Sequence, residues 1–131
     1  MSFKHFMQIH STVYGLFALA LFFVPTLLWP LYGVQVNDDY AYFLSQHNSI
    51  FLGGVAIIGF MLRDLDGKSH TAKQLLKGLL GTNLLGVVIT LYACLTGVFV
   101  GFGWSDPAFF ALLSLLSAWQ IKQIVTSNIP A

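Results

Sequence analysis

Four long apolar runs constrain this chain more than any other feature of its sequence. They cover about residues 10–29, 40–62, 74–100 and 107–124. A helix needs roughly 20 apolar residues to cross the hydrocarbon core of a bilayer, and in lipid a helix satisfies all of its own backbone hydrogen bonds. The sequence therefore predicts an all-α membrane protein, a four-transmembrane-helix bundle that forms one domain over residues 1–131.

The composition agrees with lipid as the solvent. Hydrophobic residues make up 56% of the 131 residues and charged residues only 8%, which leaves too little polar surface to cover a soluble globule. The formal net charge of +1 provides no basic field for nucleic acid. The expected partner is thus the lipid bilayer, and no nucleic-acid partner is expected.

The cations predict the direction in which the chain crosses the membrane. All six Lys and Arg flank the same ends of the four runs: Lys4, Arg63, Lys68, Lys73, Lys77 and Lys122. Short loops that carry Lys and Arg stay on the cytoplasmic side. Both termini are therefore predicted to be cytoplasmic, in a multi-pass protein of a cytoplasmic membrane.

Local signals predict where the helices begin and bend. Asn37 is the expected cap of the second helix, since a polar side chain there accepts a free amide ahead of two aspartates. Thr71 begins the spacing of a capping box, and Pro107 suits the first turn of the fourth helix. Pro25 is expected to kink the first helix.

Small residues predict how the helices pack, because helices in lipid associate through close approach of small side chains. The third run offers the clearest such face: Asn83, Gly86, Thr90, Ala93, Cys94, Gly97 and Gly101. The other runs offer shorter ones: Ser11, Gly15 and Ala18; Ser49, Gly53 and Ala56; Ala111, Ser114 and Ala118. Close packing is the preferred interpretation of all four faces.

Three adjacent polar residues near the outer end of the second run form the candidate ligand site. They are Gln46, His47 and Asn48, and polar side chains within a span are functional candidates. Thr96 and Trp104 would approach from the third and fourth helices, and His47 could accept a proton. The alternative is that these residues lie in the headgroup zone and only bond to neighbouring helices.

Other polar groups give little support to catalysis or to a cofactor. His5 and His10 are expected at the inner edge of the first span, with His70 in the inner loop and His47 near the outer side, so no pair suits a haem. The three inner histidines could meet as a weak metal site, but their spacing matches no established ligand motif. Glu is absent and every Asp lies near a predicted helix end. Asn83 is expected to make an interhelical hydrogen bond. No catalytic residue, metal ligand or cofactor is predicted.

Short glycine motifs give a resemblance to a known group. Tyr32-Gly33-Val34, Leu52-Gly53-Gly54 and Gly103-Trp104 make the layout similar to that of small bacterial four-span proteins of the DoxX-like kind, over most of the chain. The resemblance implies a bacterial inner-membrane protein with an accessory role beside a larger membrane complex. It carries over no catalytic residue.

The leading functional hypothesis is a small non-catalytic membrane protein that associates with a membrane partner or forms a homo-oligomer. Twelve Phe and three Trp supply large apolar contact areas for such an interface. One alternative is a quinone-, lipid- or apolar-ligand-binding protein with its site at Gln46, His47 and Asn48. A second alternative is a small-solute transporter.

Overall fold

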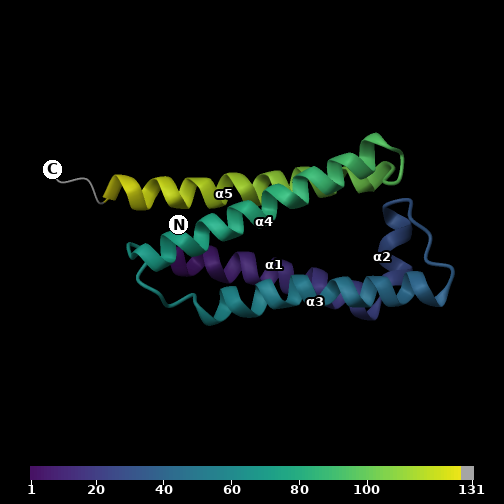
Figure 1. Ribbon diagram of the computed structural model, residues 1–131, viewed down its shortest axis with the longest axis horizontal. Helices are drawn as coiled ribbons and strands as arrows, with labels where there is room; N and C mark the ends of the chain where they lie inside the picture. Colours follow the sequence, from purple (N-terminus) through teal and green to yellow (C-terminus); the bar gives the residue numbers. More distant parts are fainter. Residues whose placement is uncertain (128–131) are drawn as a thin grey trace.

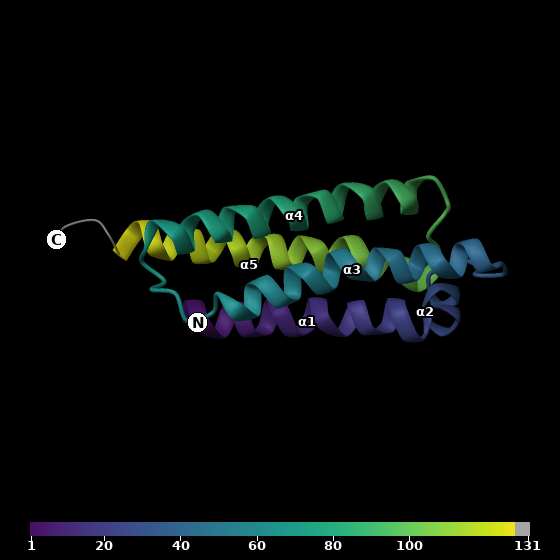
Figure 2. The same ribbon diagram turned by 60° about the horizontal axis from the view of Figure 1, so that its bottom comes forward.

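The computed structural model describes residues 1–127, and every regular element in this part of the chain is helical. The elements are α1 (Phe3–Phe23), α2 (Pro25–Leu31), α3 (Asp39–Met61), α4 (His70–Leu95), the short 3-10 helix η1 (Gly101–Trp104) and α5 (Ser105–Ser127). Four long helices run side by side along the molecule, and the short α2 lies across one end (Figures 1 and 2).

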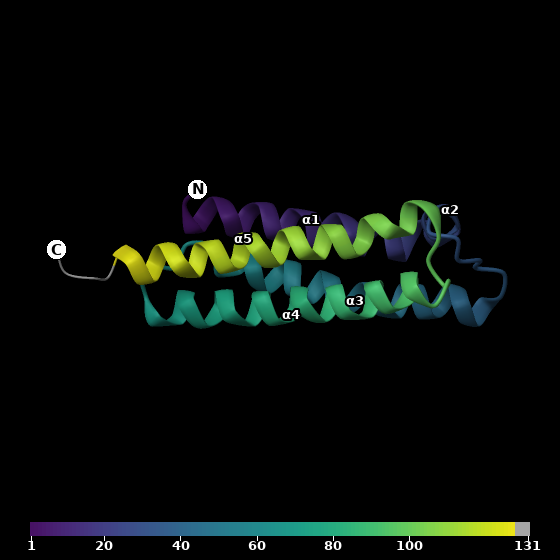
Figure 3. The same cartoon turned by 90° about the horizontal axis from the view of Figure 1, so that it is seen from above.

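Four segments are long and apolar enough to cross a membrane: α1, α3, α4, and the segment Gly101–Ser127 that combines η1 and α5. The predicted all-helical architecture with four membrane-crossing helices is confirmed at this level, and the chain is a multi-pass membrane protein. The N-terminus, the loop between α3 and α4, and the end of α5 lie at the end of the molecule opposite to α2 (Figure 3).

The helices begin at serine and aspartate caps. Ser2 caps α1, and its Oγ accepts the amide of His5 at 3.2 Å. Asp38 caps α3 by accepting the amide of Ala41 at 2.7 Å, so the prediction of Asn37 as the cap is wrong by one residue. Ser69 caps α4, so the capping box predicted at Thr71 is also wrong. Each true cap places a short oxygen acceptor directly before the first free amides.

Proline and glycine end two of the helices earlier than the hydropathy suggests. α1 stops at Phe23 because Pro25 disfavours helical geometry at the residue before it, and Val24 has φ −133° and ψ 43°. α4 stops at Leu95 rather than near residue 100. Gly97 follows with φ +78°, which suits glycine. Gly97 and Gly101 therefore lie outside α4, and their predicted place on its packing face is wrong.

Two pairs of helices form the closest backbone contacts, α1 with α3 and α4 with α5. In the first pair, a Cβ placed on Gly53 would lie 3.6 Å from the Cβ of Ala18, and one placed on Gly15 would lie 3.8 Å from the Cβ of Ala56. The predicted small-residue faces of these two helices do pack. On α5 the predicted face is displaced, because Ala118 is exposed while Ser117 is buried.

An aromatic cluster closes the end of the bundle that carries α2. The ring of Tyr32 packs against those of Trp29, Phe99 and Phe102, and the Val100 amide donates to the Tyr32 carbonyl at 2.9 Å. Trp29 Nε1 donates to the Ser45 hydroxyl at 2.8 Å. Burial raises the pKa of the Tyr32 phenol, which keeps it neutral. The ring contacts and the two hydrogen bonds fix α2 across this end of the molecule.

Candidate functional site

A polar cluster lies inside the bundle, between α1 and α4. Asn83 is fully buried and His10 is only 1% exposed. The Tyr14 hydroxyl donates to Asn83 Oδ1 at 2.6 Å, and Asn83 Nδ2 lies 3.0 Å from His10 Nε2. The interhelical hydrogen bond predicted for Asn83 is confirmed, and it has two partners rather than one.

The hydrogen bonds assign the protons within this cluster. Because Tyr14 donates to the amide oxygen, the Asn83 amide nitrogen faces the imidazole and donates to its Nε2. The proton of a neutral His10 then resides on Nδ1. Among the described residues, neither His10 Nδ1 nor the Ser11 hydroxyl has a hydrogen-bond partner. Because Nε2 of His10 accepts a hydrogen bond, the imidazole is neutral. The three hydrogen-bonded side chains of the cluster therefore carry no charge.

Aromatic packing extends the cluster to α5. The rings of His10 and Tyr14 stack with their centroids 4.6 Å apart, and Tyr14 meets Phe110 edge-on at 6.4 Å. Interhelical hydrogen bonds in membrane bundles average about 0.6 kcal/mol, so these bonds contribute modestly but specifically. We interpret the cluster as the polar contact that fixes the α1/α3 pair against the α4/α5 pair.

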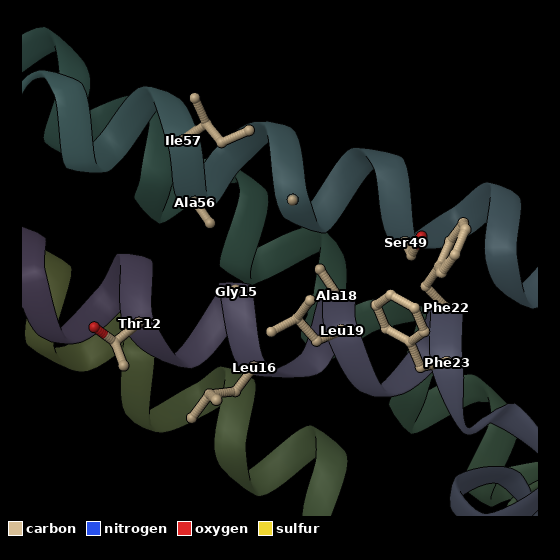
Figure 4. A pocket seen from close by; sticks show the side chains of 11 residues that line it. Thr12, Gly15, Leu16, Ala18, Leu19, Phe22, Phe23, Ser49, Ala56 and Ile57 are labelled. Atoms are coloured by element: carbon tan, nitrogen blue, oxygen red, sulfur yellow. The ribbon is translucent and has the colours of Figure 1, made fainter.

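A long apolar groove follows α1 and α3 on the outside of the bundle (Figure 4). Its volume is about 510 Å³, within the range of roughly 300 to 1,000 Å³ that ligand pockets occupy. Small residues form its floor where the two helices touch: Gly15, Ala18, Gly53 and Ala56. Larger side chains form its sides: Leu16, Leu19, Phe22, Phe23 and Ile57. The groove is open along the outside of the α1/α3 pair and can accept an apolar body.

The three polar residues predicted on the second helix lie on different sides of α3. Gln46 is half-buried and donates from Nε2 to the Phe22 carbonyl at 3.3 Å, at one end of the groove. His47 is exposed and lies between the rings of Phe43 and Phe51 on its own helix. Asn48 is exposed. Only Gln46 of the three thus adjoins the groove.

Thr96 and Trp104 lie at the same end of the bundle but on other elements. Thr96 directly follows α4, and its hydroxyl donates to the Tyr92 carbonyl in the last turn of that helix at 2.8 Å. Trp104 is exposed in η1, whose closely packed neighbours are α2, α4 and α5. Within residues 1–127, no hydrogen bond joins any two of the five predicted site residues. A ligand site formed by the five residues stays a prediction.

Sequence reasoning missed His10 and Tyr14 as members of the buried cluster. The sequence predicts His10 at the inner edge of the first span, whereas α1 begins seven residues earlier at Phe3 and places His10 two turns inside the helix. The available signal is the i, i+4 spacing of His10 and Tyr14, which puts both on one helix face with Met7 and Ser11. No family model, curated protein or solved structure matches this chain.

Proposed function

We propose that this chain is a non-catalytic membrane protein that works by association within the bilayer, and that its α1/α3 groove receives a second copy of the chain. The groove is the observation that carries this proposal. Its small-residue floor lets another helix approach closely, which is how helices associate in lipid. Its sides supply large apolar contact areas beyond that floor.

The shape of this face favours a second copy as the occupant. Two copies in one membrane share the same orientation, so a two-fold axis along the membrane normal brings the same face of each together. The exposed side chains of Leu16, Leu19 and Phe23 form a ridge on α1 directly beside the groove. The ridge of each copy can then enter the groove of the other.

The proposal includes an orientation and a location. The loop between α3 and α4 carries Arg63 and Lys68, and Lys4 forms an ion pair with Asp64 of the same loop. The positive-inside rule supports assigning this end of the bundle to the cytoplasm. The resemblance of the sequence layout to that of DoxX-like proteins is the ground for proposing a bacterial inner membrane and an accessory role beside a larger complex. In that role the dimer would present its remaining lipid-facing surface to the complex.

Cross-linking in native membranes tests the dimer. Leu19→Cys places a thiol on the ridge, where the native side chain is 55% exposed, and Leu115→Cys places one on α5, where it is 70% exposed. Both are made in a Cys94→Ala background, which removes the single native thiol. We expect a cross-linked dimer from Leu19→Cys and little from Leu115→Cys. Equal yields from both positions would show random collision and overturn the proposal.

A second measurement separates the dimer from a ligand site. The mass of the purified protein in mild detergent should be that of a dimer for the native chain and of a monomer for a Leu16→Ala, Leu19→Ala double variant. A native monomer that retains a quinone or lipid in the groove would refute the dimer. That result would favour the apolar-ligand alternative, for which Gln46 provides the adjoining polar group.

A further inference from the structure

A second cleft lies at the opposite end of the bundle from α2. Its volume is about 410 Å³, and it is formed where the start of α1, the loop after α3 and the last turns of α5 meet. Polar and charged residues line much of it: Lys4, Asp66, Lys68, Gln120 and Gln123. Phe3, Leu65 and Ile124 add apolar surface. The cleft thus combines cations and amides with apolar contacts at the bundle end.

The side-chain charges at this cleft, those of Lys4, Arg63, Lys68, Asp64 and Asp66, sum to a single positive charge. Lys4 Nζ lies 2.6 Å from Asp64 Oδ1, and an Arg63 nitrogen lies 3.6 Å from Asp64 Oδ2. Two cations therefore share one carboxylate, and the hydrogen bond from Lys4, together with the attraction of both cations, holds the pKa of Asp64 below its usual range. Asp66 accepts the backbone amide of Lys68 at 3.0 Å, and its charge offsets that of the Lys68 ammonium.

Specific contacts hold the residues around the cleft in place. Gln120 is 2% exposed, and its Nε2 donates to the Met1 carbonyl at 3.0 Å, which joins α5 to the start of α1. Gly67 packs so closely on Phe3 that a Cβ there would lie 2.7 Å from the Phe3 Cβ. These two contacts fix the loop and both helix ends around the opening.

We propose that this cleft binds the headgroup of an anionic membrane phospholipid, with its phosphate facing Lys4 and Lys68. The net positive charge of these side chains complements the negative charge of a phosphodiester, and the apolar surface of Phe3, Leu65 and Ile124 can contact the glycerol end of the acyl chains. Basic pockets at the ends of membrane helices hold such headgroups. This site is independent of the α1/α3 groove.

The test uses spin-labelled phosphatidylglycerol and spin-labelled phosphatidylcholine with the full chain in phosphatidylcholine vesicles. The measured quantity is the preference of the protein for the anionic lipid. One cation near an anionic headgroup is worth about 1 kcal/mol, or roughly fivefold. Lys68→Gln should lower the preference by about that factor. Lys77→Gln is the matched control, because Lys77 is an exposed cation on α4 that does not line the cleft.

A variant without a charge change tests the same site by shape. Gln123 is exposed and lines the cleft, so Gln123→Phe should fill it and lower the preference while the fold is kept. Inorganic phosphate at the same ionic strength as a chloride control should not compete. Equal losses in Lys68→Gln and Lys77→Gln, or competition by inorganic phosphate alone, would overturn the proposal.

Discussion

Replacing Asn83 should weaken the bundle more than any other single polar substitution in α4. Asn83→Leu keeps a side chain of similar size but removes both hydrogen bonds, to Tyr14 and to His10. Interhelical hydrogen bonds in membranes are worth about 0.6 to 1.7 kcal/mol each, so the two together give about 1.2 to 3.4 kcal/mol. Tyr14→Phe removes one bond and should cost about half as much.

The effect can be measured as the free energy of unfolding in mixed micelles, with the denaturing detergent varied and helicity followed by circular dichroism. Thr82→Val is the matched control. Thr82 is the neighbour of Asn83 on α4, but its hydroxyl donates to the Gly78 carbonyl of its own helix at 2.9 Å. We expect Thr82→Val to change the free energy of unfolding by less than about 0.5 kcal/mol, as substitutions away from interhelical contacts do.

A double-mutant cycle decides whether the contact itself carries the energy. If Tyr14 and Asn83 stabilise the bundle through their hydrogen bond, the cost of Tyr14→Phe should nearly vanish in the Asn83→Leu background. The coupling energy should then be about 0.6 to 1.7 kcal/mol. Additive costs, with a coupling energy of zero, would refute the reasoning even if both single variants were unstable.

Two further predictions concern packing and charge. Gly86→Ala should cost about 1 to 3 kcal/mol, because its new Cβ would overlap the ring of Phe110, while Gly81→Ala meets open space and should not destabilise the bundle in the same unfolding assay. Asp64 should stabilise the protein at neutral pH, because the hydrogen bond from Lys4 lowers the pKa of its carboxyl in the folded state. This contribution should be lost as the pH falls through the folded pKa. Asp64→Asn should therefore lower the free energy of unfolding at pH 7, and this cost should shrink as the pH falls. A cost that stays the same on acidification would contradict this prediction.

The sequence predicts the number and order of the long helices, and it predicts the second one closely, at 40–62 against the observed Asp39–Met61. The first helix begins earlier than predicted because its first two turns are amphipathic. Phe3 and Phe6 are buried there, while Lys4 and His5 are exposed, and averaged hydropathy hides this pattern. The third long helix, α4, ends early because Gly97 has a positive φ. Hydropathy carries no information about backbone conformation.

The buried cluster shows a different limit of sequence reasoning. Asn83 could be predicted as an interhelical donor because an amide inside an apolar run needs a partner. Its partners could not be identified, because Tyr14 and His10 lie 69 and 73 residues away along the chain. That pairing depends on the rotation of α1 against α4, which is set by the packing of the α1/α3 pair against the α4/α5 pair. The groove likewise becomes visible only once α1 and α3 are placed together.

The cluster and the groove make separable contributions, because they lie on different interfaces. The groove is formed within the α1/α3 pair, whose contacts at Gly15 and Gly53 do not involve Asn83. The cluster joins that pair to α4. Asn83→Leu should therefore lower the free energy of unfolding and leave the cross-linking of Leu19→Cys unchanged in native membranes. If Asn83→Leu abolished that cross-link while the protein stayed folded, the docking face would depend on how α4 holds α1, and the α1/α3 pair could not be the complete binding unit.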